Sequence, residues 1–338
     1  MTAAQADLAL PVTDPALEQR LRARLVLVEK ALHDHTRSQS PFITEAASHL
    51  LAAGGKRFRP LLVLLAAETG EHPHSDDVIT AACVVELTHL ASLYHDDVMD
   101  EAEVRRGIAS ANATYDNNVA ILTGDLLFAR SSELTAELGP EAVAIQARTF
   151  AALVEGQILE GVAPALGADP VAHHLNVVAG KTGALIATSA RYGAMFGGAS
   201  DVVVKALTAY GEIVGMAFQL SDDILDIASE TVESGKTPGT DLREGIPTLP
   251  MLLARRSIRP SDARLLELLA MVGDGGLTDD KLHAECLALL RVHPAMEEAR
   301  AYVIERAREA KELLAALPEG PVRESLETFA DYVARRTA

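Results

Sequence analysis

The stretch Asp96-Asp97-Val98-Met99-Asp100 closes an apolar run that begins near Val84. Asp96 and Asp100 are four residues apart, so on a helix their carboxylates lie on one face, where like charges repel. An exposed acidic helix face is the usual origin of such a cluster. Here the apolar flanks leave little of the helix for solvent, and carboxylates crowded beside a core need a cation. Hard oxygen ligands favour Mg²⁺, so the stretch predicts a metal-binding helix end.

The same pattern returns at Asp222-Asp223-Ile224-Leu225-Asp226, again after an apolar approach over residues 214–220. Two such motifs that face each other could hold several Mg²⁺ ions. Mg²⁺ bound by few carboxylates completes its coordination with water and substrate phosphates. The pair of motifs therefore indicates a phosphorylated substrate.

Composition favours an all-α protein. Hydrophobic residues make up 49% of the 338 residues and aromatic residues only 4%, with few β-branched runs. No change in composition divides the chain, so we expect a flexible tail over residues 1–14 and one helical domain over residues 15–338. The only cysteines, Cys83 and Cys286, indicate no disulfide framework and favour a reducing cytoplasm.

The net charge limits the possible partners. The chain has 30 basic and 48 acidic residues, a net charge of −18, which disfavours binding to nucleic acid or to anionic membranes. The start of the chain has no basic segment followed by an apolar core, so no signal peptide is predicted, and no window resembles a membrane span. We therefore expect a soluble protein whose basic residues serve local purposes.

Start and stop signals predict a succession of helices. Asp14-Pro15 and Ser40-Pro41 are typical N-cap and N1 pairs, and Gly54-Gly55 ends the second helix. Residues 107–118 and 229–240 read as loops, the second mobile before ligand binds. Helices are expected over residues 15–36, 41–53, 60–69, 76–100, 119–138, 140–161, 170–197 and 201–226, and a charged helical shell over residues 251–338.

Basic and polar residues accompany both motifs. Lys56, Arg57 and Arg59 follow Gly54-Gly55 at a helix start, where backbone amides favour an anion, although a plain surface turn would look similar. The other candidates are Arg105 and Arg106 just after the first motif, His89 two turns before it, Lys181 and Thr182 within an apolar helix, and Gln219 before the second motif. Taken singly, His89, Thr182 and Gln219 are more typical of satisfied core residues.

Several segments resemble the trans-polyprenyl diphosphate synthases in order and spacing. They are GGKRFRP, LYHDDVMDEAEVRRG, GKTG, FQLSDDILD and GKTPGTDLREGIPTLP, and the resemblance spans about residues 41–253. It implies a bundle of roughly ten or more helices around a central substrate cavity, the isoprenoid synthase type, and a homodimer. It also implies Mg²⁺-dependent condensation of isopentenyl diphosphate with an allylic diphosphate.

The resemblance implies a role for each matching position. Asp96, Asp100 and Asp222 would bind Mg²⁺, with Asp97, Asp223 and Asp226 in support. Contacts with the allylic substrate fall to Arg105, Lys181, Thr182, Gln219 and Lys236, and contacts with isopentenyl diphosphate to Lys56, Arg59, His89 and Arg106. Lys181 and Gln219 also belong to the catalytic set. One departure is Ile246, where many members have a second lysine for the leaving diphosphate.

Two other classes of protein share part of this pattern. A type I terpene cyclase also ionises allylic diphosphates with an aspartate-rich motif, but it needs no isopentenyl diphosphate pocket, so Lys56, Arg59 and His89 argue against it. A non-catalytic partner subunit would be expected to lose aspartates, and this chain keeps six.

Product length depends on the turns before Asp96. Within the resembling family, small residues there accompany long products, and this chain has Ala91 and Ser92. We therefore expect a long-chain product in the octaprenyl to nonaprenyl range, of the kind used for a quinone side chain. Geranylgeranyl diphosphate is the alternative, because Phe128 or a deeper residue could form a second floor.

Overall fold

The computed structural model describes residue 8 and residues 10–229, 238–272 and 276–336. Most of this is helical and the strands are confined to one short hairpin, which confirms the all-α expectation. The chain divides into two compact units. Unit 1 comprises Met1–Phe150, Leu185–Gly211 and Leu314–Thr328, and unit 2 comprises Ala151–Ala184, Glu212–Leu313 and Phe329–Ala338. Lys236 and most of the loop predicted over residues 229–240 lie outside the described residues.

Unit 1 holds the first aspartate motif. Its complete elements are α1 (Pro15–His35), α2 (Pro41–Ala52), α3 (Phe58–Ala67), α4 (Asp76–Met99), β1 (Val104–Arg105), β2 (Ile108–Ala109), α5 (Ala111–Tyr115), α6 (Asn117–Glu137) and the short η4 (Leu314–Ala316). The predicted caps are confirmed: Asp14 accepts the Leu17 N–H at 2.6 Å, and Ser40 caps α2. The third helix begins at Phe58, two residues before the predicted start.

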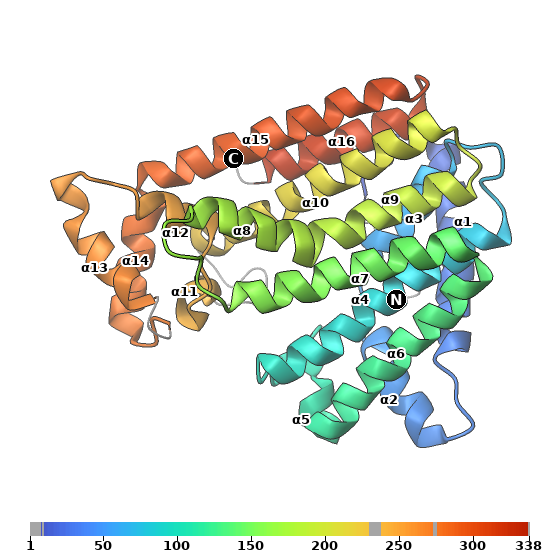
Figure 1. The fold of residues 1–338 in the computed structure, drawn as a ribbon, viewed down its shortest axis with the longest axis horizontal. Helices are drawn as coiled ribbons and strands as arrows, with labels where there is room; N and C mark the ends of the chain where they lie inside the picture. The colour runs from blue at the N-terminus through green and yellow to red at the C-terminus, as the bar shows by residue number, and fades with distance from the viewer. Residues whose placement is uncertain (1–7, 9, 230–237, 273–275, 337–338) are drawn as a thin grey trace. The chain divides into compact units, whose positions relative to one another are not determined.

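Helix α4 is the core of unit 1. It packs mainly against α6 and α3, and Figure 1 shows α6 running beside it. By length and composition alone α4 could cross a membrane, contrary to the expectation that no window qualifies, but 67% of its most apolar window is buried in the fold. Such burial is what the core helix of a soluble protein requires.

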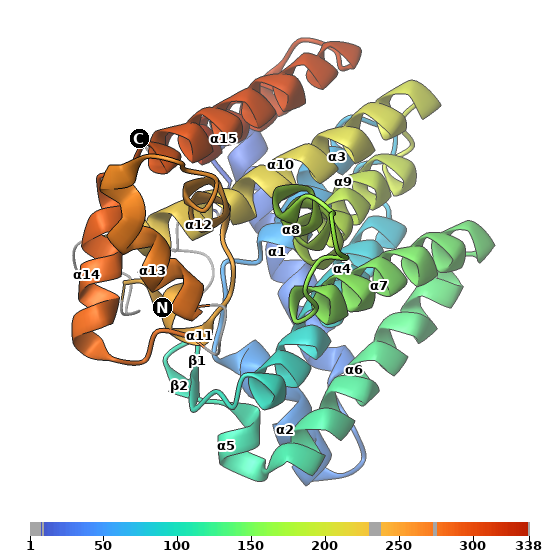
Figure 2. The same ribbon diagram turned by 60° about the vertical axis from the view of Figure 1, so that its left-hand side comes forward.

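A two-stranded hairpin that the sequence did not predict follows the first motif. β1 pairs antiparallel with β2, so that Arg105 lies opposite Ile108 (Figure 2). Arg106 and Gly107 form the connecting turn with φ of 54° and 78°, the left-handed conformations that a tight hairpin turn requires. Arg105 therefore ends β1, and Arg106 is the first residue of the turn.

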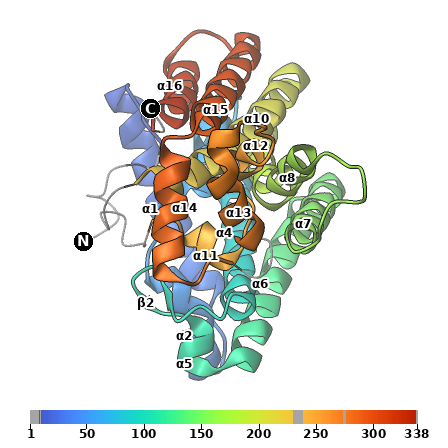
Figure 3. The same cartoon turned by 90° about the vertical axis from the view of Figure 1, so that its left-hand side faces the viewer.

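Unit 2 holds the second motif. Its complete elements are α8 (Pro170–Val178), the π-helical turn η1 (Ala179–Gly183), α11 (Thr240–Glu244), α12 (Leu249–Ala254), the 3₁₀ turn η3 (Pro260–Asp262), α13 (Ala263–Val272), α14 (Asp280–Arg291) and α15 (Pro294–Leu313). Figure 3 shows α13 and α14 beside each other. Four helices belong partly to each unit: α7 (Pro140–Glu160), α9 (Ala184–Phe196), α10 (Asp201–Ala228) and α16 (Pro321–Arg335).

The predicted helix over residues 170–197 is not uniform. Its middle, the segment Ala-Gly-Lys-Thr-Gly, forms the π turn η1. π-helical turns in proteins are rare and often occur at functional sites. This one contains Lys181 and Thr182, two of the predicted substrate contacts.

Candidate active site

In unit 1 the first motif ends α4, and its carboxylates differ in exposure. Asp97 is fully buried and accepts a hydrogen bond from Arg105 Nε at 2.5 Å. Burial raises the pKa of Asp97, and the Arg105 contact opposes that rise. The Asp100 side chain is 54% exposed, with Oδ2 4.0 Å from Arg105 Nη2. Asp97 therefore anchors the hairpin, whereas the Asp100 side chain is half exposed.

Arg57 has a structural role that the sequence did not reveal. It is in the left-handed conformation with φ of 49°, and its buried guanidinium pairs with Glu29 at 2.5 Å and with Glu86 at 3.1 Å. It also donates to the carbonyls of Gly54 and Leu51. Arg57 thus stabilises the glycine turn through these buried hydrogen bonds. The neighbouring Lys56 is exposed.

Arg59, His89 and Arg106 influence one another electrostatically, as expected for an anion site. Burial lowers the pKa of Arg59 to about 10; Glu86 opposes this change and Arg106 adds to it. Arg59 Nε is buried without a hydrogen-bond partner among the described residues. Arg106 donates to the carbonyls of Leu50, at 2.8 Å, and of Gly54. Unit 1 therefore brings several of the predicted isopentenyl diphosphate residues together.

The surroundings of His89 favour its neutral form. Burial lowers its pKa well below the ordinary value, and the nearby arginines, first Arg59 and then Arg106, lower it further. A neutral imidazole can donate one hydrogen bond to an anion without adding another buried positive charge. The cluster is thus cationic enough to attract a diphosphate, and its members are partly buried.

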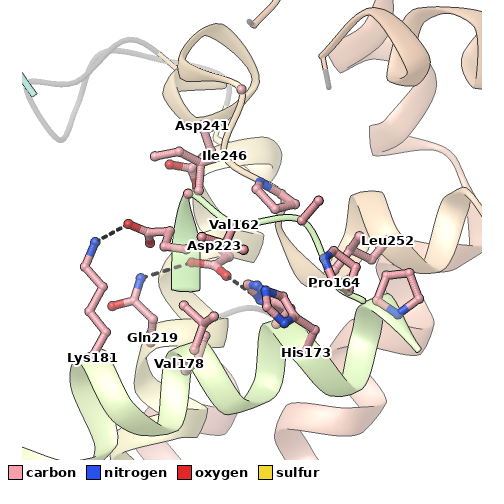
Figure 4. Close-up of a pocket in the computed structure, with 18 of the residues that line it drawn as sticks. Val162, Pro164, His173, Val178, Lys181, Gln219, Asp223, Asp241, Ile246 and Leu252 are labelled. Carbon is pink, nitrogen blue, oxygen red and sulfur yellow. Dashed lines mark hydrogen bonds and ion pairs between the residues drawn. The ribbon is translucent and has the colours of Figure 1, made fainter. Parts of the chain in front are cut away.

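In unit 2 a cavity of about 460 Å³ lies beside the second motif. Polar and apolar side chains both line it, and Figure 4 shows Lys181, Gln219 and Asp223 close to one another; these residues, with Thr182, are called the polar wall below. The polar residues include Glu160, Lys181, Thr182, Gln219, Asp223 and Asp241, and the apolar residues include Val162, Pro164, Val177, Val178, Ile246 and Leu252. Ile246, at the departure noted in the sequence, lines this cavity.

The polar wall is connected by hydrogen bonds. Lys181 Nζ lies 2.6 Å from Glu160 Oε2. The Thr182 hydroxyl donates to Gln219 Oε1 at 3.3 Å, and Gln219 Nε2 donates to Asp223 Oδ1 at 3.1 Å. Lys181, Thr182, Gln219 and Asp223, singled out separately in the sequence, thus share one wall.

Two glycines fix the backbone of the π turn against α7. A Cβ added at Gly156 would lie 2.5 Å from the Lys181 backbone nitrogen, and one added at Gly180 would lie 2.7 Å from the Ala152 carbonyl oxygen. Both distances are too short for any side chain, so α7 and η1 touch backbone to backbone. This contact sets the position of Lys181.

Asp226, the last aspartate of the second motif, caps α11. Its carboxylate accepts the backbone N–H groups of Thr240 at 3.1 Å and Asp241 at 3.2 Å, and its carbonyl accepts that of Gly239 at 2.9 Å. Asp226 therefore joins the end of α10 to the segment that follows the loop.

Asp222 forms an ion pair with Arg336 near the end of the chain. The Arg336 guanidinium also lies 4.6 Å from the centre of the Phe218 ring. Because Arg336 lies outside every motif, no sequence signal indicated this contact.

The carboxylates near the two motifs include donors that a divalent cation could use. Within the parts of the chain that the structure describes, no three His, Cys, Asp or Glu side chains converge on a ready-made site. Asp222 nevertheless already pairs with a cation, and Asp100 is half exposed. These donors suit Mg²⁺ that takes its remaining ligands from water and phosphate. Asp96 and Asp100 belong to unit 1 and Asp222 to unit 2, so the expectation that the motifs face each other stays a prediction.

Comparison with known proteins gives consistent matches. The polyprenyl synthetase family model matches residues 40–286. A nonaprenyl diphosphate synthase of Mycobacterium tuberculosis is 47% identical over 323 residues, 96% of this chain and 95% of that protein. A geranylgeranyl pyrophosphate synthase of Corynebacterium glutamicum, solved with calcium and isoprenyl diphosphate, has a TM-score of 0.87 and 45% identity, covering 97% of this chain and 100% of that one. A decaprenyl diphosphate synthase of Rhodobacter capsulatus has a TM-score of 0.86 and 35% identity, covering 96% and 99%.

Proposed function

The chain belongs to the polyprenyl synthetase family, and from that premise we propose that it elongates an allylic diphosphate with isopentenyl diphosphate to a long-chain all-trans polyprenyl diphosphate. Asp96, Asp100 and Asp222 would hold Mg²⁺, which offsets the negative charge that develops on the departing diphosphate. In the reaction the allylic C–O bond breaks with its electrons on the diphosphate. The double bond of isopentenyl diphosphate attacks the allylic carbon, and a proton then passes to the released diphosphate.

The side chains of each unit have separate tasks in this proposal. Isopentenyl diphosphate is bound by Lys56, Arg59, His89 and Arg106 of unit 1. Arg105, which donates to Asp97, contacts the allylic diphosphate. Lys181, Thr182 and Gln219 of unit 2 bind the allylic diphosphate, with Lys236 as a further contact proposed from the motif. The donors are placed before charge develops, which is how fixed dipoles and charges accelerate ionisation.

The observation that carries the proposal is the partly buried cluster of Arg59, His89 and Arg106 beside the first aspartate motif. An enzyme that only ionised an allylic diphosphate would have no use for a second anion site. The test is incubation of the purified protein with labelled isopentenyl diphosphate, Mg²⁺ and allylic starters of several lengths. Labelled allylic diphosphates are expected; a hydrocarbon made without isopentenyl diphosphate would instead indicate a terpene cyclase.

Product length should respond to the residue one turn before Asp96. Ser92 is four residues earlier, on the same face of α4, and is half-buried, whereas Ala91 is fully buried and lies a third of a turn further round. We expect Ser92→Phe to shorten the products to farnesyl or geranylgeranyl diphosphate while turnover persists, and Ala91→Phe to do the same. Chromatography of the dephosphorylated products measures this; unchanged length in both variants would contradict it.

Geranylgeranyl diphosphate remains the alternative product because of a polar crosslink in unit 1. Thr88 Oγ1 lies 2.8 Å from Ser131 Oγ and accepts from Gln146 Nε2 at 2.7 Å. Thr88 is eight residues, about 12 Å, along α4 from Asp96, so a tail that follows this helix would meet polar groups there. The rings of Phe128 and Phe150 are tilted by 55° with their centroids 4.3 Å apart, and the Phe128 ring lies 5.6 Å from that of His95. Product analysis of the unaltered enzyme decides between the two lengths.

Arg336 should compete with Mg²⁺ for Asp222. Removing this partner takes away one competitor for the carboxylate, so Arg336→Ala is expected to bind Mg²⁺ roughly two- to fivefold more tightly in the absence of substrate. The neighbouring Arg335→Ala is the control, because that exposed guanidinium lies 3.8 Å from Asp331 instead. Calorimetric titration with Mg²⁺ measures both; equal or weaker binding by Arg336→Ala would contradict the competition.

We further propose that the two units form one prenyltransferase domain, that the protein is a cytoplasmic homodimer, and that it acts without nucleic acid. The family match across residues of both units supports the first point. Exposed apolar side chains on α6, such as Ile121 and Leu122, support a contact with a second copy.

A further inference from the structure

His174 lies on the wall of the unit 2 cavity, and neither the sequence motifs nor the proposed reaction gives it a task. It is on α8, and its side chain is more than nine-tenths buried, with 8% exposed. We propose that His174 is a positioning residue that holds Asp223, and through it the end of α10, in place for the allylic diphosphate. This inference rests on the proposed function of the same site.

The two oxygens of Asp223 have different neighbours. Oδ1 accepts from Gln219, which stands four residues earlier on the same helix, so this bond orients the side chain but does not hold α10 against α8. Oδ2 lies 3.5 Å from His174 Nε2, and Figure 4 marks this ion pair. Nε2 is buried and makes no hydrogen bond within the described chain, so its polar contact is this ion-pair approach to Asp223. His174 is therefore the side chain of α8 that faces Asp223.

The contact completes a double connection between two helical segments. Along α8 and η1, His174 precedes Thr182 by eight residues, and each contacts a residue of α10: His174 contacts Asp223, and Thr182 contacts Gln219. Without His174 this double connection would be reduced to the Thr182 bond. Asp223 is also buried. A buried carboxylate oxygen that loses its polar partner raises the free energy of the folded protein, so the side chain tends to move. Movement of Asp223 would displace Asp222, the adjacent metal ligand.

Two substitutions of similar polarity separate positioning from mere packing. In His174→Gln the amide nitrogen can reach the place of Nε2, whereas in His174→Asn the shorter side chain cannot. We expect His174→Asn to lower kcat at least about tenfold with little change in KM for isopentenyl diphosphate, and His174→Gln to stay within about threefold of the unaltered enzyme. His173→Asn is the matched control, because His173 Nε2 contacts the Leu159 carbonyl at 3.1 Å.

A second measurement does not depend on turnover. Calorimetric titration with Mg²⁺ and inorganic diphosphate should show about tenfold weaker binding by His174→Asn and recovery in His174→Gln. If His174 acts through Asp223, then in an Asp223→Asn background the His174→Asn change should add less than about threefold to the loss. Thermal unfolding of each variant confirms that the fold is kept.

The outcomes are distinct. Equal losses in His174→Asn and His174→Gln, full activity in both, or independent losses in the double variant would overturn the positioning role. Absence of prenyl transfer in the unaltered protein would instead reject the proposed function, and the diphosphate titration would still report on His174.

Discussion

Replacing Asp96 or Asp222 by Ala is expected to lower kcat by about 10³-fold or more while the protein stays folded. The reason is that each change removes a proposed Mg²⁺ ligand, and the metal supplies several kcal/mol of charge stabilisation in the transition state. Neither side chain belongs to the buried core, so little stability should be lost. Steady-state turnover with Mg²⁺, together with thermal unfolding, measures the effect.

A suitable control is Asp125→Ala. Asp125 is an exposed carboxylate of α6 that lies 3.4 Å from His95, near the first motif but outside it. Near wild-type turnover in Asp96→Ala or Asp222→Ala, or activity undiminished by EDTA, would rule out the metal role.

Arg59→Ala is expected to weaken the binding of isopentenyl diphosphate far more than the binding of the allylic substrate. A hydrogen bond from a charged group contributes about 1.5 to 3 kcal/mol, so the apparent affinity should fall roughly 10- to 150-fold. The pKa of Arg59, about 10, keeps it cationic at neutral pH, and its buried Nε, which has no hydrogen-bond partner in the described part of the chain, is suited to a ligand. KM values measured separately for the two substrates test this.

Arg59→Lys should recover part of the loss, since it keeps the charge but not the fork. Arg130→Ala serves as the control, because that arginine pairs with Glu133 on the surface of α6. Equal changes in both KM values for Arg59→Ala would contradict the assignment of Arg59 to the isopentenyl diphosphate pocket.

Features encoded by neighbouring residues could be predicted from the sequence. Asp14 and Ser40 cap α1 and α2 as expected, because an N-cap depends on a side chain and the amides two or three residues on. The apolar content identified the all-α class, and the five-residue motifs located the aspartates at or near the ends of α4 and α10. These are short-range properties of the chain.

Only the tertiary structure revealed which of these residues pair with other side chains or backbone groups of the protein. Asp97 holds Arg105, Asp226 caps α11, and Arg336 pairs with Asp222 across 114 residues of chain. The π turn at Lys181 likewise depends on Gly156, which lets α7 approach its backbone. The sequence by itself determined the helical class, the motifs and the family. Packing alone decided which aspartates are held by protein partners, because these partners are brought together by burial of distant segments and no local pattern specifies them.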